Sequence, residues 1–173
     1  MIYFYIIFSA AFLILLSAVY AGWRAAPWVP TSRIDVGRII KLAEIQPGQK
    51  FYDLGSGDGR IICAAAREGA TAEGIEISIL PYCLSRIRSL FRGKSKITFG
   101  DFWWKDLSDA NIIYFFLMPK VYPKLKSKFK NELKSGTKII ARTWPFKDWE
   151  PLAVDVSEGC SALYLYQTPL DKN

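Results

Sequence analysis

The N-terminal segment is the feature that most constrains this chain. No charged side chain occurs between Ile2 and Trp23, a run of 22 residues. As an α-helix this run would be about 33 Å long, which matches the roughly 30 Å hydrocarbon core of a bilayer. Aromatic side chains suited to membrane interfaces flank it: Tyr3, Tyr5, Tyr20, Trp23 and Trp28. We therefore expect residues 1–23 to form a single-pass transmembrane anchor.

Two other interpretations of this segment remain open. A cleaved signal peptide would explain the small-residue pattern at Val19-Tyr20-Ala21, but the basic region that precedes such peptides is missing and the apolar run is long. A buried core helix would need a larger protein around it. Basic residues follow the run closely, at Arg24, Arg33, Arg38 and Lys41. The positive-inside bias then predicts that the C-terminal domain lies on the cytoplasmic or equivalent side of the membrane.

The composition excludes several chemistries. The 173 residues contain no histidine, so Ser-His-Asp and Cys-His catalysis and histidine-ligated zinc are ruled out. The three cysteines, Cys63, Cys83 and Cys160, are far apart in sequence. They predict neither a metal site nor a disulfide framework. The net charge of +7 is compatible with attraction to anionic headgroups or with an acidic partner, and the charge alone does not decide between them.

The rest of the chain has the pattern of one α/β domain. We expect a stiff linker over residues 24–32 and a domain over residues 33–173. Ser32 is the expected N-cap of the first helix, with Val36, Ile39 and Ala43 on its apolar face, and Gln46-Pro47-Gly48 should end that helix.

Strand and helix patterns alternate after this first helix. Helices are expected at 60–68, 80–91 and 122–133. Strands are expected at 50–54, 71–77, 96–99, 111–116, 137–142, 153–156 and 161–166. The strand at 111–116 is apolar on both faces and should be central. The last two strands should form an antiparallel hairpin. This order predicts a doubly wound, mostly parallel, seven-stranded Rossmann-like sheet behind one N-terminal transmembrane helix.

A glycine-rich turn follows the first expected strand. Its glycines are Gly55, Gly57 and Gly59, with Ser56 between the first two. Such a turn lies at the carboxyl ends of the strands, where ligands bind in this architecture, and glycine there allows a positive φ and close approach of a ligand. The spacing is G-x-G-x-G, which differs from the G-x-G-x-x-G of pyrophosphate-binding loops. This difference disfavours a nicotinamide-dependent reductase.

Acidic residues at three strand ends predict the ligand. Asp53 precedes the glycines and suits an ammonium group, although it would repel a pyrophosphate. Glu76 ends the second strand, where a carboxylate can bind a ribose diol. Asp101 follows the third strand and could accept a hydrogen bond from an adenine amine, with Ile77 or Phe102 against the ring. An amine, a ribose and an adenine without phosphate describe S-adenosylmethionine.

The segment Asp53-Leu-Gly-Ser-Gly-Asp-Gly-Arg60 resembles motif I of the class I S-adenosylmethionine-dependent methyltransferases, and Glu76 and Asp101 match the next two cofactor positions of that superfamily. The resemblance implies that the chain is an enzyme of this class.

A closer resemblance is to the membrane-anchored protein-lysine N-methyltransferases that modify the adenine nucleotide translocase and the c subunit of ATP synthase. It covers residues 28–151 and rests on five motifs and Trp149. The motifs are Val29-Pro30-Thr31, Gly100-Asp101-Phe102-Trp103, Asp106-Leu107-Ser108, Leu117-Met118-Pro119 and Trp144-Pro145-Phe146. It implies that Pro30 and Thr31 border the cofactor and the substrate. The chain departs from the family's usual Leu-Trp at Phe102-Trp103 and from its Gly-Val-Pro-like sequence at Phe116–Pro119.

The ends of the fourth and fifth strands should form the acceptor pocket. Its candidate residues are Leu117, Met118, Pro119, Trp144, Pro145 and Phe146, with Trp103, Phe115 and Phe116 as further aromatic walls. An apolar pocket would favour the neutral amine of a lysine substrate. Alternatively, aromatic faces could hold it as the ammonium ion.

These observations predict a membrane-anchored S-adenosylmethionine-dependent protein-lysine N-methyltransferase that acts on a membrane protein with an accessible lysine. A lipid, small-molecule or RNA acceptor is the alternative within the same class, with nucleic acid disfavoured. A membrane-tethered cofactor-binding or interaction module is the non-enzyme alternative. The lysine-rich segment 120–134 should form a solvated face or contact the membrane or the substrate.

Overall fold

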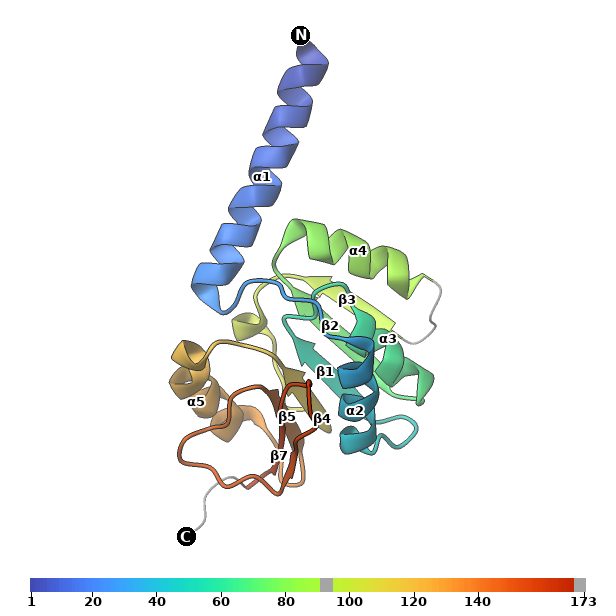
Figure 1. Ribbon diagram of the computed structural model, residues 1–173, viewed down its shortest axis with the longest axis vertical. Coiled ribbons are helices and arrows are strands. Elements are labelled where there is room, and N and C mark those ends of the chain that lie inside the picture. The colour runs from blue at the N-terminus through green and yellow to red at the C-terminus, as the bar shows by residue number, and fades with distance from the viewer. Residues whose placement is uncertain (91–94, 170–173) are drawn as a thin grey trace.

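The computed structural model describes residues 1–90 and 95–169 and contains a seven-stranded sheet in the order β3-β2-β1-β4-β5-β7-β6 (Figure 1). The strands are β1 Lys50–Leu54, β2 Thr71–Glu76, β3 Ser95–Phe99, β4 Ile112–Phe115, β5 Lys138–Arg142, β6 Ala153–Asp155 and β7 Leu163–Gln167. Strands β1 to β5 pair in parallel, and β7 pairs antiparallel with both β5 and β6. This confirms the predicted doubly wound sheet with its closing hairpin.

Helices cover both faces of the sheet. They are α2 Arg33–Ala43, α3 Arg60–Arg67, α4 Ile79–Ser89 and α5 Tyr122–Glu132, with 3-10 turns at Phe102–Trp104 (η1) and Pro119–Val121 (η2). Helices α2 and α3 share one buried cluster with Ile112 and Tyr114 of β4. Helix α5 shares the other with Ile113 and Phe115 of the same strand. The prediction that β4 is central and apolar on both faces is therefore confirmed.

Local signals in the sequence set the ends of α2. The Ser32 side chain accepts a hydrogen bond from the Asp35 backbone N–H at 3.0 Å, which confirms Ser32 as the N-cap. The helix ends at Ala43, three residues before the predicted stop at Gln46-Pro47-Gly48, because Glu44 adopts a left-handed conformation with φ of 48°. The Lys138 ammonium holds this end by donating to the Ala43 carbonyl and to the Glu44 carboxylate. Position 91 of the predicted 80–91 helix lies outside the described residues.

Helix α1 spans Ile2–Arg24 and projects away from the domain (Figure 1). It is long and apolar enough to cross a membrane, and none of its apolar window is buried. The interpretation of this segment as a buried core helix is therefore wrong. Contact with the domain is confined to the C-terminal part of α1, where Ala21 is buried and Ser17 Oγ accepts a hydrogen bond from the Ile79 N–H.

Candidate functional site

The glycine-rich turn between β1 and α3 is a tight bend. Gly55, Gly57 and Gly59 have φ values of 84°, 54° and 74°, which any other residue rarely adopts. The backbone N–H groups of Gly55 and Ser56 both donate to the Ile75 carbonyl, so the turn folds back over the end of β2. The bend exposes its backbone to a pocket at the carboxyl ends of the parallel strands, as the sequence predicted.

Asp53 lies at the floor of this pocket. It is 2% exposed, and no residue that the structure describes forms a hydrogen bond with its Oδ1 atom. Burial, with the charges of Glu76 and Asp58 nearby, raises the pKa of Asp53 well above its usual value. Buried carboxylates are rarely left unpaired. The site therefore fits a ligand that brings a positive charge, such as the ammonium group of an amino acid.

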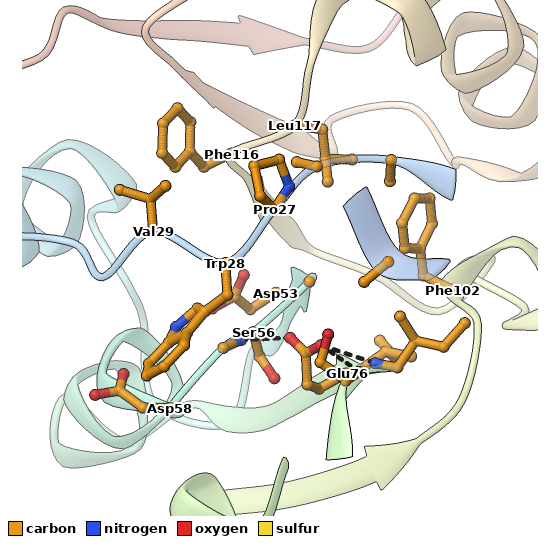
Figure 2. Close-up of a pocket in the computed structure, with 18 of the residues that line it drawn as sticks. Pro27, Trp28, Val29, Asp53, Ser56, Asp58, Glu76, Phe102, Phe116 and Leu117 are labelled. Carbon is orange, nitrogen blue, oxygen red and sulfur yellow. Dashed lines mark hydrogen bonds between the residues drawn. The ribbon is translucent and has the colours of Figure 1, made fainter. Parts of the chain in front are cut away.

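Glu76 joins the turn to the end of β2 (Figure 2). Its Oε2 accepts from the Gly57 N–H at 2.7 Å, and its Oε1 accepts from the N–H groups of Ile77 at 2.9 Å and Ser78 at 2.7 Å. Burial raises the pKa of Glu76, although these three bonds oppose that rise. The carboxylate thus fixes the turn, and Oε2, which accepts only one of these bonds, keeps a lone pair with which it could accept from a ribose hydroxyl.

Asp101 and Phe102 form the next part of the wall, after β3. Asp101 Oδ1 accepts from the Trp103 N–H at 3.1 Å. Its Oδ2 accepts from Nη2 of Arg24, at 2.7 Å, and from Nε of the same side chain. Phe102 is buried and lines the pocket with Ile77. Asp101, the acid expected to bind adenine, therefore lines the pocket, and it also forms an ion pair with Arg24, the last residue of α1.

The linker 25–31 forms the remaining wall of the pocket. Trp28 lies over the glycine turn (Figure 2), and a Cβ added to Gly57 would be 2.6 Å from its Nε1 atom. From the sequence, Trp28 is expected at a membrane interface. The structure instead packs its ring against the backbone of the turn, which only a glycine at position 57 permits.

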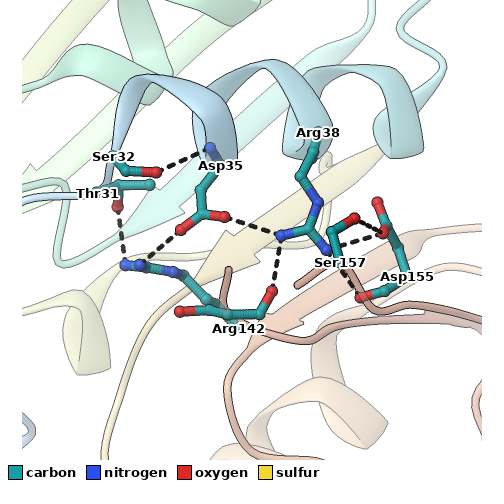
Figure 3. Close-up of polar contacts among 8 residues, drawn as sticks. Thr31, Ser32, Asp35, Arg38, Arg142, Asp155 and Ser157 are labelled. Atoms are coloured by element: carbon teal, nitrogen blue, oxygen red, sulfur yellow. Dashed lines mark hydrogen bonds and ion pairs between the residues drawn. The ribbon is translucent and has the colours of Figure 1, made fainter. Parts of the chain in front are cut away.

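Pro30 and Thr31, the expected gate residues, also line the pocket, and a polar network holds Thr31 (Figure 3). The Arg60 guanidinium donates to the Thr31 carbonyl, and Arg142 donates to the Thr31 hydroxyl at 3.3 Å. Arg142 also forms a 2.8 Å ion pair with Asp35 of α2. The linker is thus anchored from both sides of the pocket.

The acceptor-pocket candidates divide into three groups. Leu117 is buried and lines the pocket. Met118, Pro119, Trp144 and Pro145 are exposed, and the Trp144 ring stacks on Phe116 at 5.7 Å between centroids. Phe146 differs from the expectation. It is 2% exposed within an aromatic core with Trp149 and Tyr166, because its backbone N–H donates to the Tyr166 hydroxyl and holds it there. Among the further aromatic candidates, Phe115 is likewise in the core.

Two residues of the site were not predicted from the sequence: Gly74 on β2 and Tyr114 on β4, the neighbours of Asp53 in the sheet register. Tyr114 lines the pocket. Gly74 leaves room for the turn, since a Cβ there would lie 2.6 Å from Ser56 Oγ and 3.0 Å from Ile62 Cγ1. A glycine in the interior of a strand is the one signal that could have indicated this close approach.

We expect Gly74→Ala to lower the free energy of unfolding by about 1–3 kcal/mol, because the added methyl group overpacks the contact between β2 and the turn. The matched control is Gly37→Ala in α2, where nothing lies within 4 Å of the added Cβ. That change should raise stability by about 0.5–1 kcal/mol. Denaturant unfolding of both variants measures the difference. Equal stability of the two variants would contradict the close approach.

Comparisons with known proteins agree with this geometry. A family model described as the ANTKMT methyltransferase domain matches residues 53–153. A solved structure described as an RNA methyltransferase from Salinibacter ruber, in complex with S-adenosyl-L-homocysteine, has a TM-score of 0.78 and 32% identity over 84% of this chain and 97% of that chain. The fold and the pocket are therefore those of a class I S-adenosylmethionine-dependent methyltransferase, and S-adenosylmethionine is its cofactor.

The chain belongs to the ANTKMT methyltransferase family. It is 32% identical to a protein-lysine N-methyltransferase of Saccharolobus islandicus over 81% of this chain and 92% of the relative. A human lysine N-methyltransferase, named for the c subunit of ATP synthase, is 32% identical over 81% of this chain, which spans 60% of that relative. The mouse adenine nucleotide translocase lysine N-methyltransferase is 34% identical over 81% of this chain, which spans 62% of that relative. Membership of this family favours an enzyme over a non-catalytic interaction module.

Proposed function

We propose that this protein is a protein-lysine N-methyltransferase, anchored by α1 in a membrane and acting on an accessible lysine of a membrane protein. The three relatives above are named as lysine N-methyltransferases, and the names of two of them give membrane proteins, ATP synthase and the adenine nucleotide translocase, as their substrates. The observation in the structure that carries the proposal is the unpaired, buried Asp53 carboxylate beneath the glycine turn. Residues 1–23 would be the anchor, 24–32 the linker and 33–173 the catalytic domain.

The cofactor would occupy the pocket in an orientation set by its acidic residues. Asp53 would hold the amino group of the methionine part, and the backbone of Gly55, Ser56, Gly57 and Gly59 would allow its close approach. Glu76 would accept from the ribose hydroxyls, while Asp101, Ile77 and Phe102 would contact the adenine. Bound S-adenosylmethionine supplies a methyl group activated by its positively charged sulfur.

The acceptor lysine would approach between the linker and the ends of β4 and β5. A lysine must first lose its proton, which costs about 4.6 kcal/mol at pH 7 from the reference pKa of about 10.4. The apolar surfaces of Leu117, Phe116 and Trp144 disfavour the ammonium form. The Arg142 guanidinium, 4.5 Å from the Phe116 ring centre, already uses one face of that ring and adds a like charge.

Transfer itself would be an in-line displacement. The linker and the ends of β4 and β5 would hold the lone pair of the neutral lysine Nζ in line with the methyl group that the bound cofactor would supply. The contribution of the protein is positioning and exclusion of water. Pro30 and Thr31 would cover the site, since the linker lies over the glycine turn.

The proposal is tested by incubating the full-length protein, reconstituted in membranes, with methyl-labelled cofactor. We expect label in membrane protein, on lysine as shown by mass spectrometry, and loss of this label with Asp53→Asn. The Salinibacter ruber structure is described as an RNA methyltransferase, so added RNA and the lipid extract are counted separately. Label in RNA or lipid with none in protein would contradict the lysine assignment.

A further inference from the structure

The outward face of α4 is apolar, unlike that of an ordinary surface helix. Pro81 and Ser85 point into the domain and are buried. On the opposite face Leu80 is 45% exposed, Leu84 39%, Ile87 58% and Leu90, the C-cap residue, 75%. Cys83 is exposed on the same face. A surface helix usually presents polar residues outward, and these four exposed apolar side chains depart from that pattern.

The spacing of these residues makes the apolar face continuous. At 100° per residue, Ile87, Leu80 and Leu84 fall on one side of α4, and Cys83 lies next to them, between Ile87 and Leu90. Arg86 lies at one margin of this side and Arg88 at the other. Arg88 is directed along the domain surface to the Asp58 carboxylate, at 2.8 Å. An apolar stripe bordered by arginines is typical of a helix that lies in the plane of a membrane interface.

The position of α4 relative to α1 indicates which surface covers this stripe. In Figure 1, α4 lies at the side of the domain from which α1 projects. The Ile79 N–H at the start of α4 donates to Ser17 Oγ at 3.1 Å. Ser17 is seven residues, or about 10 Å along the helix, before Arg24 at the end of α1. The start of α4 is therefore level with the apolar part of α1.

We propose that α4 is an in-plane membrane helix, whose face of Leu80, Cys83, Leu84, Ile87 and Leu90 lies among the lipids at the headgroup boundary. This inference rests on the proposed anchoring by α1. The occupant is a lipid surface, because α4 begins level with the apolar part of α1 and because Arg86, exposed at the margin of the stripe, complements anionic headgroups. The domain is then held to the membrane at two places and cannot rotate freely about α1.

The native Cys83 provides the test. A polarity-sensitive fluorophore is attached to Cys83 of the full-length protein carrying Cys160→Ser, while the buried Cys63 is left in place. The protein is reconstituted in vesicles of phosphatidylcholine and phosphatidylglycerol, with or without bromine on the acyl chains. Two reference labels, each in a chain that also carries Cys83→Ser and Cys160→Ser, are placed at Leu13→Cys in α1 and at Glu158→Cys, an exposed position in the β6–β7 turn.

We expect brominated lipid to quench the labels at Cys83 and position 13 at least threefold more than the label at position 158. Adding Leu84→Glu and Ile87→Glu should reduce quenching at Cys83 to the level at position 158 and leave position 13 unchanged. Both side chains are exposed, so neither change should unfold the domain.

Each other outcome overturns the proposal in a recognisable way. If position 13 is quenched and Cys83 behaves like position 158, α1 is an anchor and α4 does not touch lipid. If neither is quenched, the anchoring itself is wrong, and the α4 proposal fails with it. Self-quenching between labelled chains that does not depend on bromine would show that a second copy of the chain covers the face.

Discussion

Asp53→Asn should weaken binding of S-adenosylmethionine by roughly 100-fold, or about 3 kcal/mol, and should stabilise the protein in the absence of cofactor. The first effect follows because a buried, charge-assisted hydrogen bond to the ammonium group is lost. The second follows because the variant no longer buries a carboxylate whose Oδ1 has no partner. Calorimetric titration measures the affinity, and thermal unfolding without cofactor measures the stability. We expect the unfolding temperature to rise by a few degrees.

This stabilisation should depend on pH. The pKa of Asp53 is raised in the folded state, so the folded protein binds the proton more tightly than the unfolded chain does. Its contribution to stability is therefore complete below the unfolded pKa of about 3.9 and is lost as the pH rises through the higher folded pKa. The advantage of Asp53→Asn should accordingly be absent in acid and grow toward neutral pH.

Asp35→Asn is the matched control for this stability effect. Asp35 is also 2% exposed, but it forms ion pairs with Arg38 and Arg142, both at 2.8 Å. Its replacement should lower stability, since it leaves the buried Arg142 without its carboxylate and removes one of the two carboxylates that Arg38 contacts. If both variants lost stability, Asp53 would have a partner in the folded protein, and its assignment to an incoming ammonium group would fail.

Glu76→Gln should weaken cofactor binding by on the order of 100-fold and should also destabilise the protein by about 1–3 kcal/mol. Both carboxylate oxygens accept from backbone N–H groups, of Gly57 on one side and of Ile77 and Ser78 on the other. An amide must turn its NH2 group toward one of these donors, whichever way it is placed. The glycine turn then loosens, and one acceptor for the ribose is lost.

Glu73→Gln is the control on the same strand. Glu73 is equally buried, at 5% exposed, but it pairs with Lys105 and Thr98 and does not line the pocket. We expect this variant to lose stability and to keep its cofactor affinity. Titration and unfolding of both variants separate the two effects. An unchanged affinity in Glu76→Gln would remove Glu76 from the cofactor site.

The sequence alone was sufficient to predict the features of the fold and of the site that depend on short-range patterns. The alternation of apolar segments predicted seven strands, the central place of β4 and the closing hairpin, because each follows from which faces of a strand are buried. The N-cap at Ser32 could likewise be predicted, because its side chain accepts a hydrogen bond from the backbone N–H of Asp35, only three residues away. The acids at 53, 76 and 101 could be found because each lies at or near the carboxyl end of a strand, and parallel strands bring these ends to one edge.

Contacts between distant segments could not be predicted in this way. The ion pair between Arg24 and Asp101 joins residues 77 apart in sequence, and the Arg142–Asp35 pair joins residues 107 apart. The local sequence around Trp28 does not distinguish a position at a lipid interface from a position over Gly57. Phe146 belongs to an aromatic cluster whose other members come from β4, α5 and β7. No local pattern distinguishes such packing from a position in the acceptor pocket.

The end of α1 and the start of the linker are bound to the domain at several points. Arg24 forms an ion pair with Asp101, the Ala25 carbonyl accepts from the Met118 N–H, and Lys120 donates to the carbonyls of Gly22 and Trp23. In a membrane-embedded chain these ties would keep the methyl donor at one constant height above the bilayer. The enzyme would then select a lysine by its distance from the lipid surface, and recognition of the neighbouring residues of the substrate would contribute little.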